Sequence, residues 1–133
     1  MDLVINNGWI KSWEGEQGHA GYSSKINMVI NLAGSMYGQE ESFKNDLWIS
    51  SNDVPMFAVY GEQDADMPCG SLQSATSTNW EFGPCVIHDR LTSLNISSEL
   101  KIISGGSHSA PREKSNINNY LPDLVDFIIT NLN

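Results

Sequence analysis

Three short apolar segments, each ended by glycine, constrain the fold of this chain more than any other feature. Segments 26–33 and 54–60 are followed at once by Gly34 and Gly61, and the third, 100–103, is followed shortly by Gly105. Runs of this kind are typical of strands that are buried on both faces of a parallel sheet. Because they alternate with helical segments, they predict right-handed crossovers and an α/β fold with about three parallel strands and flanking helices.

The helical segments differ in how clearly the sequence marks them. The pattern over 120–132 predicts an amphipathic helix of about four turns, with Pro122 in its first turn. Segment 84–95 predicts a second helix, with one apolar face. A short helix is expected around 43–49 in an otherwise polar stretch, and 70–80 has weak helical character. Segment 6–24 is interpreted as an ordered loop.

The length of 133 residues fits one domain with one core, and we expect residues 1–133 to form a single, partial domain. Three strands are only part of a doubly covered sheet, so at least one strand edge is expected to lack a partner. Such an edge makes a homo-oligomer a further expectation. The N-terminus lacks the basic and apolar regions of a signal peptide, so either the protein is intracellular or its natural start lies upstream.

Charge and hydropathy exclude two classes of partner. The formal net charge of -9 disfavours binding to nucleic acid, because an acidic surface repels phosphates. No apolar run approaches the roughly 18 residues of a membrane-spanning helix, so no membrane span is expected.

The loops that follow the second and third apolar segments carry groups suited to acid–base chemistry. Asp64 lies in the loop 61–68, and His108 lies in the loop 105–111. Parallel strands direct the loops at their carboxyl ends to one rim of the sheet, so these two side chains are expected to meet. A buried carboxylate can orient an imidazole and stabilise its protonated form. Asp66 is an alternative acid in the same loop.

These two loops resemble those of α/β-hydrolases of the esterase, lipase and feruloyl-esterase type. Gly61-Glu62-Gln63-Asp64-Ala65-Asp66-Met67-Pro68 is similar to the family loop "HGTxDxxVP", and Gly105-Gly106-Ser107-His108 is similar to "GxGH". More narrowly, segments 21–34 and 87–90 resemble secreted bacterial esterases, and the likeness covers roughly residues 13–132. It implies the C-terminal portion of an α/β-hydrolase fold, with Asp64 as acid and His108 as base. Tyr60 and Met67 depart from the family pattern, which has histidine and valine there.

The nucleophile is the main departure from the family. Its serine lies in a Gly-x-Ser-x-Gly elbow between a strand and a helix, and this sequence contains no such motif. The family's layout places the elbow before the acid, upstream of this chain. Ser35, after Gly34, is the one in-chain substitute. Ser107 and Ser109 flank the base too closely for attack through its ring.

Other reactive side chains have structural explanations beside the chemical ones. Cys69 and Cys85 lack the spacing of a zinc site, and they are either free thiols or a disulfide closing a loop of about 16 residues. His88 lies in a predicted helix and is expected to be packed or hydrogen-bonded. His19 has acidic neighbours, but their spacing fits no metal site. We therefore expect no metal and no cofactor.

The sequence leaves two functions open. The first is a carboxylic ester hydrolase with a Ser-Asp-His triad, acting on a small-molecule ester, in a full-length parent that is secreted or periplasmic. The second is a non-catalytic, degenerate hydrolase fragment that acts as a binding or oligomerisation module. A flavodoxin-like binding domain is disfavoured because no phosphate-cradling glycine loop is present.

Overall fold

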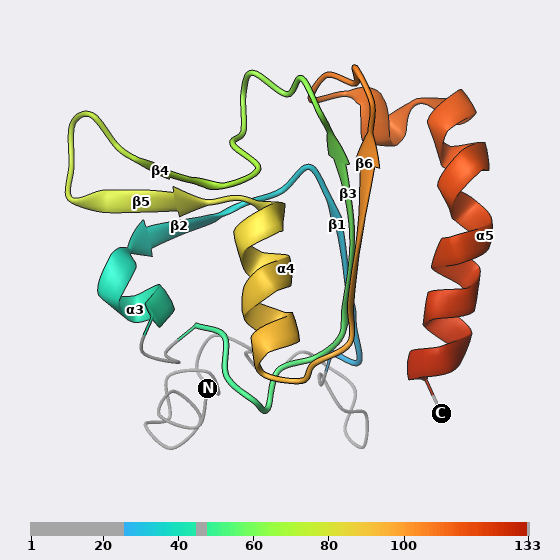
Figure 1. Cartoon of the computed structure of the whole chain (residues 1–133), viewed down its shortest axis with the longest axis horizontal. Helices are drawn as coiled ribbons and strands as arrows, with labels where there is room; N and C mark the ends of the chain where they lie inside the picture. Colours follow the sequence, from blue (N-terminus) through green and yellow to red (C-terminus); the bar gives the residue numbers. More distant parts are fainter. Residues whose placement is uncertain (1–25, 45–47, 133) are drawn as a thin grey trace, which may run out of the picture.

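The computed structural model describes residues 26–44 and 48–132 and has a mixed α/β architecture (Figure 1). The elements in chain order are β1 (Val29–Leu32), β2 (Met36–Gln39), α3 (Glu40–Lys44), β3 (Met56–Gly61), β4 (Ser71–Gln73), β5 (Asn79–Phe82), α4 (Pro84–Ser93), β6 (Ser98–Ile103), the 3-10 turn η1 (Ala110–Arg112) and α5 (Lys114–Asn131). The predicted α/β class is confirmed. Segment 6–24, with His19, lies outside the described residues.

The three predicted apolar strands form one parallel sheet in the order β1-β3-β6. β3 is the central strand, and all six of its residues are buried. Its side chains alternate between two cores. Met56 and Ala58 pack in one cluster with residues of α4, and Phe57 and Val59 pack in the other with residues of α5.

Helices α4 and α5 cover opposite faces of the parallel sheet (Figure 1). The ring of Phe57 lies 5.6 Å from that of Phe127 on α5. A salt bridge of 2.8 Å joins Lys101 on β6 to Asp123 on α5 and fixes that side of the helix beside β6. Both helices therefore lie over β3 and β6.

The weak helical character predicted for 70–80 is wrong. This region contains β4 and β5, which pair antiparallel and form a second sheet with β2 in the order β2-β5-β4. The polar residues between the strands make the turn of a hairpin, closed by a 2.9 Å bond from Ser74 N to Asn79 O. Phe82 stacks on Phe43 with ring centres 4.2 Å apart. Tertiary packing of the aromatic ring decides the conformation here.

The helix predicted around 43–49 occurs earlier, at Glu40–Lys44, after a strand that the sequence analysis did not predict. Residues 48–53 contain no helix. The ring of Trp48 packs directly against Gly38, where a β-carbon would overlap it. The backbone N–H of Ser50 donates to Asp53 Oδ2 at 2.7 Å, which stabilises a turn instead of a helix.

The C-terminal helix is confirmed but is longer than expected. It begins at Lys114 and not near Tyr120, so Pro122 lies inside it and not in its first turn. Proline removes one backbone hydrogen bond in a helix interior. Pro122 is on the exposed side of α5, where water can hydrogen-bond the freed carbonyl.

The two outer strands of the parallel sheet each have one partner among the described residues. Side chains on both faces of β1 are exposed: Val29 at 41%, Ile30 at 46% and Leu32 at 41%. A cavity of about 410 Å³ borders β1 on the α4 side, with Met56, Ile87 and Leu91 in its wall. Within 26–44 and 48–132, the helices are too short or too polar to cross a membrane.

Candidate active site

Asp64 lies in the loop that follows β3, and the loop backbone holds its carboxylate. Oδ1 accepts hydrogen bonds from the backbone N–H groups of Asp66, at 2.9 Å, and Met67, at 3.0 Å. The N–H of Asp64 itself donates to Gly61 O at 3.0 Å. These backbone bonds therefore orient the carboxylate without the help of another side chain.

His108 lies in the loop that follows β6, and its ring meets Asp64 at the carboxyl ends of two neighbouring strands. Nδ1 and Asp64 Oδ2 are 2.9 Å apart. The Asp64 side chain is 0% exposed, whereas the His108 side chain is 35% exposed. In the described part of the chain, Nε2 of His108 has no hydrogen-bond partner. The pair therefore has a buried acid and an imidazole whose outer nitrogen is available.

The environment keeps Asp64 ionised. Burial by itself would raise the pKa of this carboxyl group, but the hydrogen bond from His108 and those from the backbone of Met67 and Asp66 outweigh it, so the pKa is lowered. A carboxylate that accepts an Nδ1–H bond fixes the tautomer in which Nε2 carries a lone pair. That nitrogen can accept a proton from a nucleophile.

Close contact between the two loops makes this meeting possible. A β-carbon at Gly61 would overlap the carbonyl oxygens of Ser107 and Gly106. The backbone N–H of Gln63 donates to Gly106 O at 2.8 Å, and that of Glu62 donates to Ile103 O at 2.9 Å. Glycine at position 61 is therefore required by the close approach of the loop that carries His108.

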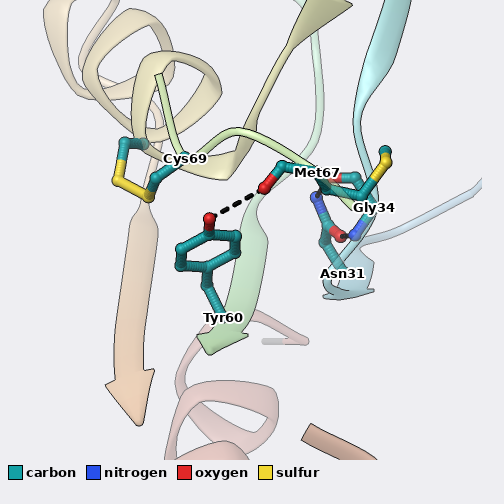
Figure 2. The surroundings of a disulfide bond; sticks show 6 residues. Asn31, Gly34, Tyr60, Met67 and Cys69 are labelled. Carbon is teal, nitrogen blue, oxygen red and sulfur yellow. Dashed lines mark hydrogen bonds between the residues drawn. A yellow bond between two sulfur atoms is a disulfide. The ribbon is translucent and has the colours of Figure 1, made fainter. Parts of the chain in front are cut away.

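A disulfide joins Cys69, just beyond the acid loop, to Cys85 in the first turn of α4 (Figure 2). Their Cα atoms are 5.1 Å apart. Beside it, the hydroxyl of Tyr60 donates to Met67 O at 2.8 Å, as Figure 2 shows. Burial, and then the nearby Asp64 carboxylate, raise the pKa of Tyr60, so it remains a donor. These contacts attach the end of the acid loop to the core.

The side chains of the remaining predicted candidates make no described hydrogen bond to Asp64 or His108. The Ser35 hydroxyl donates to Glu81 Oε1 at 2.8 Å. No described hydrogen bond connects Ser35 to His108. Asp66 is exposed and contributes only its backbone N–H to the acid. His88 Nδ1 lies 2.9 Å from Ser98 Oγ, so this histidine is hydrogen-bonded, as predicted.

One arrangement in this region has the composition of a metal site. Ligand atoms of Asp64, Asp66 and His108 lie within 4.8 Å of one another. However, both oxygens of Asp64 already accept hydrogen bonds, and one of these comes from the His108 ring nitrogen nearest to it. A cation would have to displace them, so the geometry fits a hydrogen-bonded pair better than a ligand set.

The sequence analysis missed the contributions of Tyr60 and Glu62. Tyr60 counted only as a departure from the family pattern, yet its hydroxyl holds the acid loop. Glu62 connects the acid loop to residues just before His108, through Ser104 and Gly105. Their positions beside a glycine at a strand end were the only available signal, because the Tyr60 bond reaches Met67, farther along the same loop, and the Glu62 bonds reach a different loop.

Comparison with known proteins adds no family assignment. A scan against protein-family models, a search of curated proteins and a search of solved structures each found no match.

Proposed function

We propose that this chain carries the acid, Asp64, and the base, His108, of a carboxylic ester hydrolase of the α/β-hydrolase type. The observation that carries the proposal is the 2.9 Å contact between Asp64 Oδ2 and His108 Nδ1 at the carboxyl ends of β3 and β6. Catalytic groups of open parallel sheets gather at that rim. The acid follows β3, and the base follows β6, which neighbours β3 in the sheet. The acid comes before the base in the chain, which is the order that this family uses.

In the proposed reaction, Nε2 of His108 removes the proton of a serine hydroxyl as the serine oxygen attacks the ester carbonyl. The imidazolium then donates that proton to the departing alcohol, and in the second half-reaction the histidine activates water in the same way. Asp64 remains ionised throughout and stabilises the imidazolium. Its lowered pKa supports this role, because a carboxylate cannot help a cation once it is protonated.

The serine itself is proposed to precede the acid in the polypeptide, as in the family order. Ser35 is the weaker assignment because its hydroxyl is bound to Glu81. The substrate class is a small-molecule ester. A secreted or periplasmic location of the parent is supported by the disulfide, because such bonds persist in oxidising compartments.

The test is hydrolysis of p-nitrophenyl acetate by the natural polypeptide that contains these residues. His108→Ala should abolish nearly all activity, and Asp64→Asn should reduce it strongly, because both remove parts of one proton-transfer unit. His88→Ala is the matched control, since His88 is hydrogen-bonded to Ser98 and lies on α4. Hydrolysis that survives His108→Ala would reject the assignment.

The open edge of β1 favours a second candidate, a module that self-associates. Val29, Ile30 and Leu32 are exposed on a strand whose outer edge has no described partner. An antiparallel pairing with β1 of a second copy would complete the ladder and join two sheets. Sedimentation equilibrium measures this association directly, and a strict monomer at high concentration would reject it.

A further inference from the structure

Glu62 occupies an unusual position between the two loops of the candidate site. Its Oε2 oxygen accepts two hydrogen bonds, from Ser104 Oγ at 2.8 Å and from the backbone N–H of Gly105 at 2.9 Å. Glu62 comes two residues before Asp64, and the two donors come shortly before His108. One carboxylate oxygen thus joins the segment that carries the acid to the segment that carries the base.

The donors belong to a tight turn that redirects the chain after β6. The backbone N–H of Gly106 donates to Ile103 O at 3.0 Å, which closes a four-residue turn. Gly105 has φ of +66°, the left-handed conformation expected at the third position of a type II turn. The backbone N–H of Gly105, at this third position, is the one that donates to Glu62. The shape of this turn determines where His108 emerges.

Bonds between backbone groups also position the two loops, but none of those described uses the Ser104 hydroxyl or the Gly105 N–H. They run from Glu62 N to Ile103 O and from Gln63 N to Gly106 O. The Glu62 carboxylate is the only described group that accepts a hydrogen bond from the Ser104 hydroxyl and from the Gly105 N–H. These two donors lower the pKa of Glu62, so the bridge is ionised at neutral pH.

We propose that Glu62 is a positioning residue for the Asp64–His108 pair, keeping His108 Nδ1 in hydrogen-bond contact with Asp64 through the turn of residues 103–106. Its consequence for catalysis rests on the proposed function, but the positioning itself does not. The bridge is exposed, so its removal changes global stability little. Its effect is on the geometry of the pair, where a small displacement breaks the contact.

The experiment is NMR of the ring nitrogens of His108 and of the Asp64 carboxyl carbon in this chain. In the unmodified protein, the neutral ring of His108 should be the Nδ1–H tautomer, because that nitrogen donates to Asp64. Glu62→Ala should shift His108 toward the Nε2–H form of free imidazole and move the Asp64 pKa upward. Glu62→Gln keeps an acceptor oxygen and should largely restore both signals.

Glu99→Ala is the matched control, because it removes a carboxylate from β6 and breaks the 2.7 Å ion pair with Lys101 without touching Ser104 or Gly105. It should change neither signal. If Glu62→Ala does not fold, Ser104→Ala removes one of the two donors and should give a smaller shift in the same direction. Unchanged tautomer and Asp64 titration in the variants that fold would overturn the inference.

The outcome is independent of the nucleophile. Loss of the Nδ1–H tautomer in Glu62→Ala would support positioning even if ester hydrolysis were shown to survive His108→Ala. Conversely, hydrolysis that requires His108, together with an unaffected tautomer in Glu62→Ala, would support the proposed function and reject the role of Glu62.

Discussion

The two outer strands of the parallel sheet differ in almost every property that protects a strand edge. β6 carries Glu99 and Lys101, and Lys101 forms a second salt bridge to Asp123 on α5. Charged residues on an edge discourage pairing with other chains. β1, in contrast, lies in segment 26–39, which has no charged residue. The candidate site is built on the protected side, at the ends of β3 and β6.

The difference extends to the helix layer. Leu121, Val125 and Ile129 form an exposed apolar stripe on α5, on the flank turned away from Asp123 and hence from β6. Ile30 and Leu32 lie on the same face of the sheet as this stripe, since they are in register with Phe57 and Val59. The sheet edge at β6, beside the Asp64–His108 pair, is therefore protected by charged residues, whereas β1 leaves apolar side chains exposed. We call these the closed side and the open side.

An open side of this kind sets a limit on how a second copy could bind. In an antiparallel β1 pair, the two α5 helices would be about four strand spacings apart, roughly 19 Å. Helices pack at about 8–10 Å, so the two stripes would not meet. Association through β1 is thus expected to be weak, resting on the strand ladder and a few apolar contacts.

The largest expected effect concerns the closed side. His108→Ala should lower the rate of p-nitrophenyl acetate hydrolysis by the natural polypeptide by on the order of 10⁴-fold or more. Among residues 26–44 and 48–132, the His108 imidazole is the only side chain hydrogen-bonded to Asp64 Oδ2, and it can transfer the proton. His88→Ala should leave the rate within about threefold, since His88 is half-buried on α4, is hydrogen-bonded to Ser98 and makes no described contact with Asp64 or His108. Equal losses in the two variants would show that the effect is structural.

The next effect tests how strongly the two sides differ in packing. Phe57→Ala should reduce the free energy of unfolding by about 3–5 kcal/mol, because Phe57 is fully buried and packs against Phe127. Val29→Ala on the open strand should cost less than about 1 kcal/mol. Guanidinium unfolding of both variants gives the comparison. A loss at Val29 as large as at Phe57 would mean that β1 is covered in solution.

Elements that depend on local sequence patterns could be predicted, whereas elements that depend on contacts between distant residues could not. The three parallel strands and α4 follow from local apolar patterns that glycines interrupt. The Asp64–His108 contact was predicted because strand order brings loops to one rim. The second sheet was missed, since its strands are short and β2 pairs with β5 across about 40 residues. No local pattern marks such a pairing.

The start of α5 and the roles of Tyr60 and Glu62 were missed for a related reason. Helix α5 begins before its apolar pattern becomes regular. Ile117 is the first residue of α5 that packs against the cluster containing Phe57. The Tyr60 hydroxyl reaches the carbonyl of Met67 in the loop after its own strand, and the Glu62 carboxylate reaches a different loop. A residue's neighbours in sequence do not reveal contacts of this kind.

A third prediction concerns the disulfide that attaches the acid loop to α4. Replacing both cysteines, Cys69→Ser with Cys85→Ser, should lower the free energy of unfolding by about 3 kcal/mol, because the crosslink closes a loop of 16 residues in the unfolded chain. Reduction of the unmodified protein should give the same loss. An unchanged denaturation midpoint after reduction would contradict the prediction.

A fourth, smaller effect is the pH dependence that Asp64 contributes. Its folded-state pKa is lowered, so its stabilising contribution is complete above the ordinary value of about 3.9 and is lost as the pH falls through the lower folded value. The difference in stability between the unmodified chain and Asp64→Asn should therefore shrink on acidification below about pH 4. Unfolding curves at several pH values measure it.

His108→Ala provides the internal control for that titration. It removes one donor to Asp64 but leaves the two backbone N–H groups of Asp66 and Met67 in place. Part of the acid sensitivity should therefore remain in this variant. If Asp64→Asn and the unmodified chain lose stability in parallel on acidification, the carboxylate does not have a lowered pKa in solution.

The smallest expected effect concerns the open side. The chain should self-associate weakly through β1, and Ile30→Lys should weaken this association by about tenfold, corresponding to about 1.4 kcal/mol, because it places charge on an uncharged edge. Ile102→Lys is the matched control, since Ile102 is 55% exposed on the opposite outer strand. Each copy carries a net charge of -9, so added salt should strengthen association by screening the repulsion. Equal weakening by both substitutions in sedimentation equilibrium would mean that β1 is not the edge that pairs.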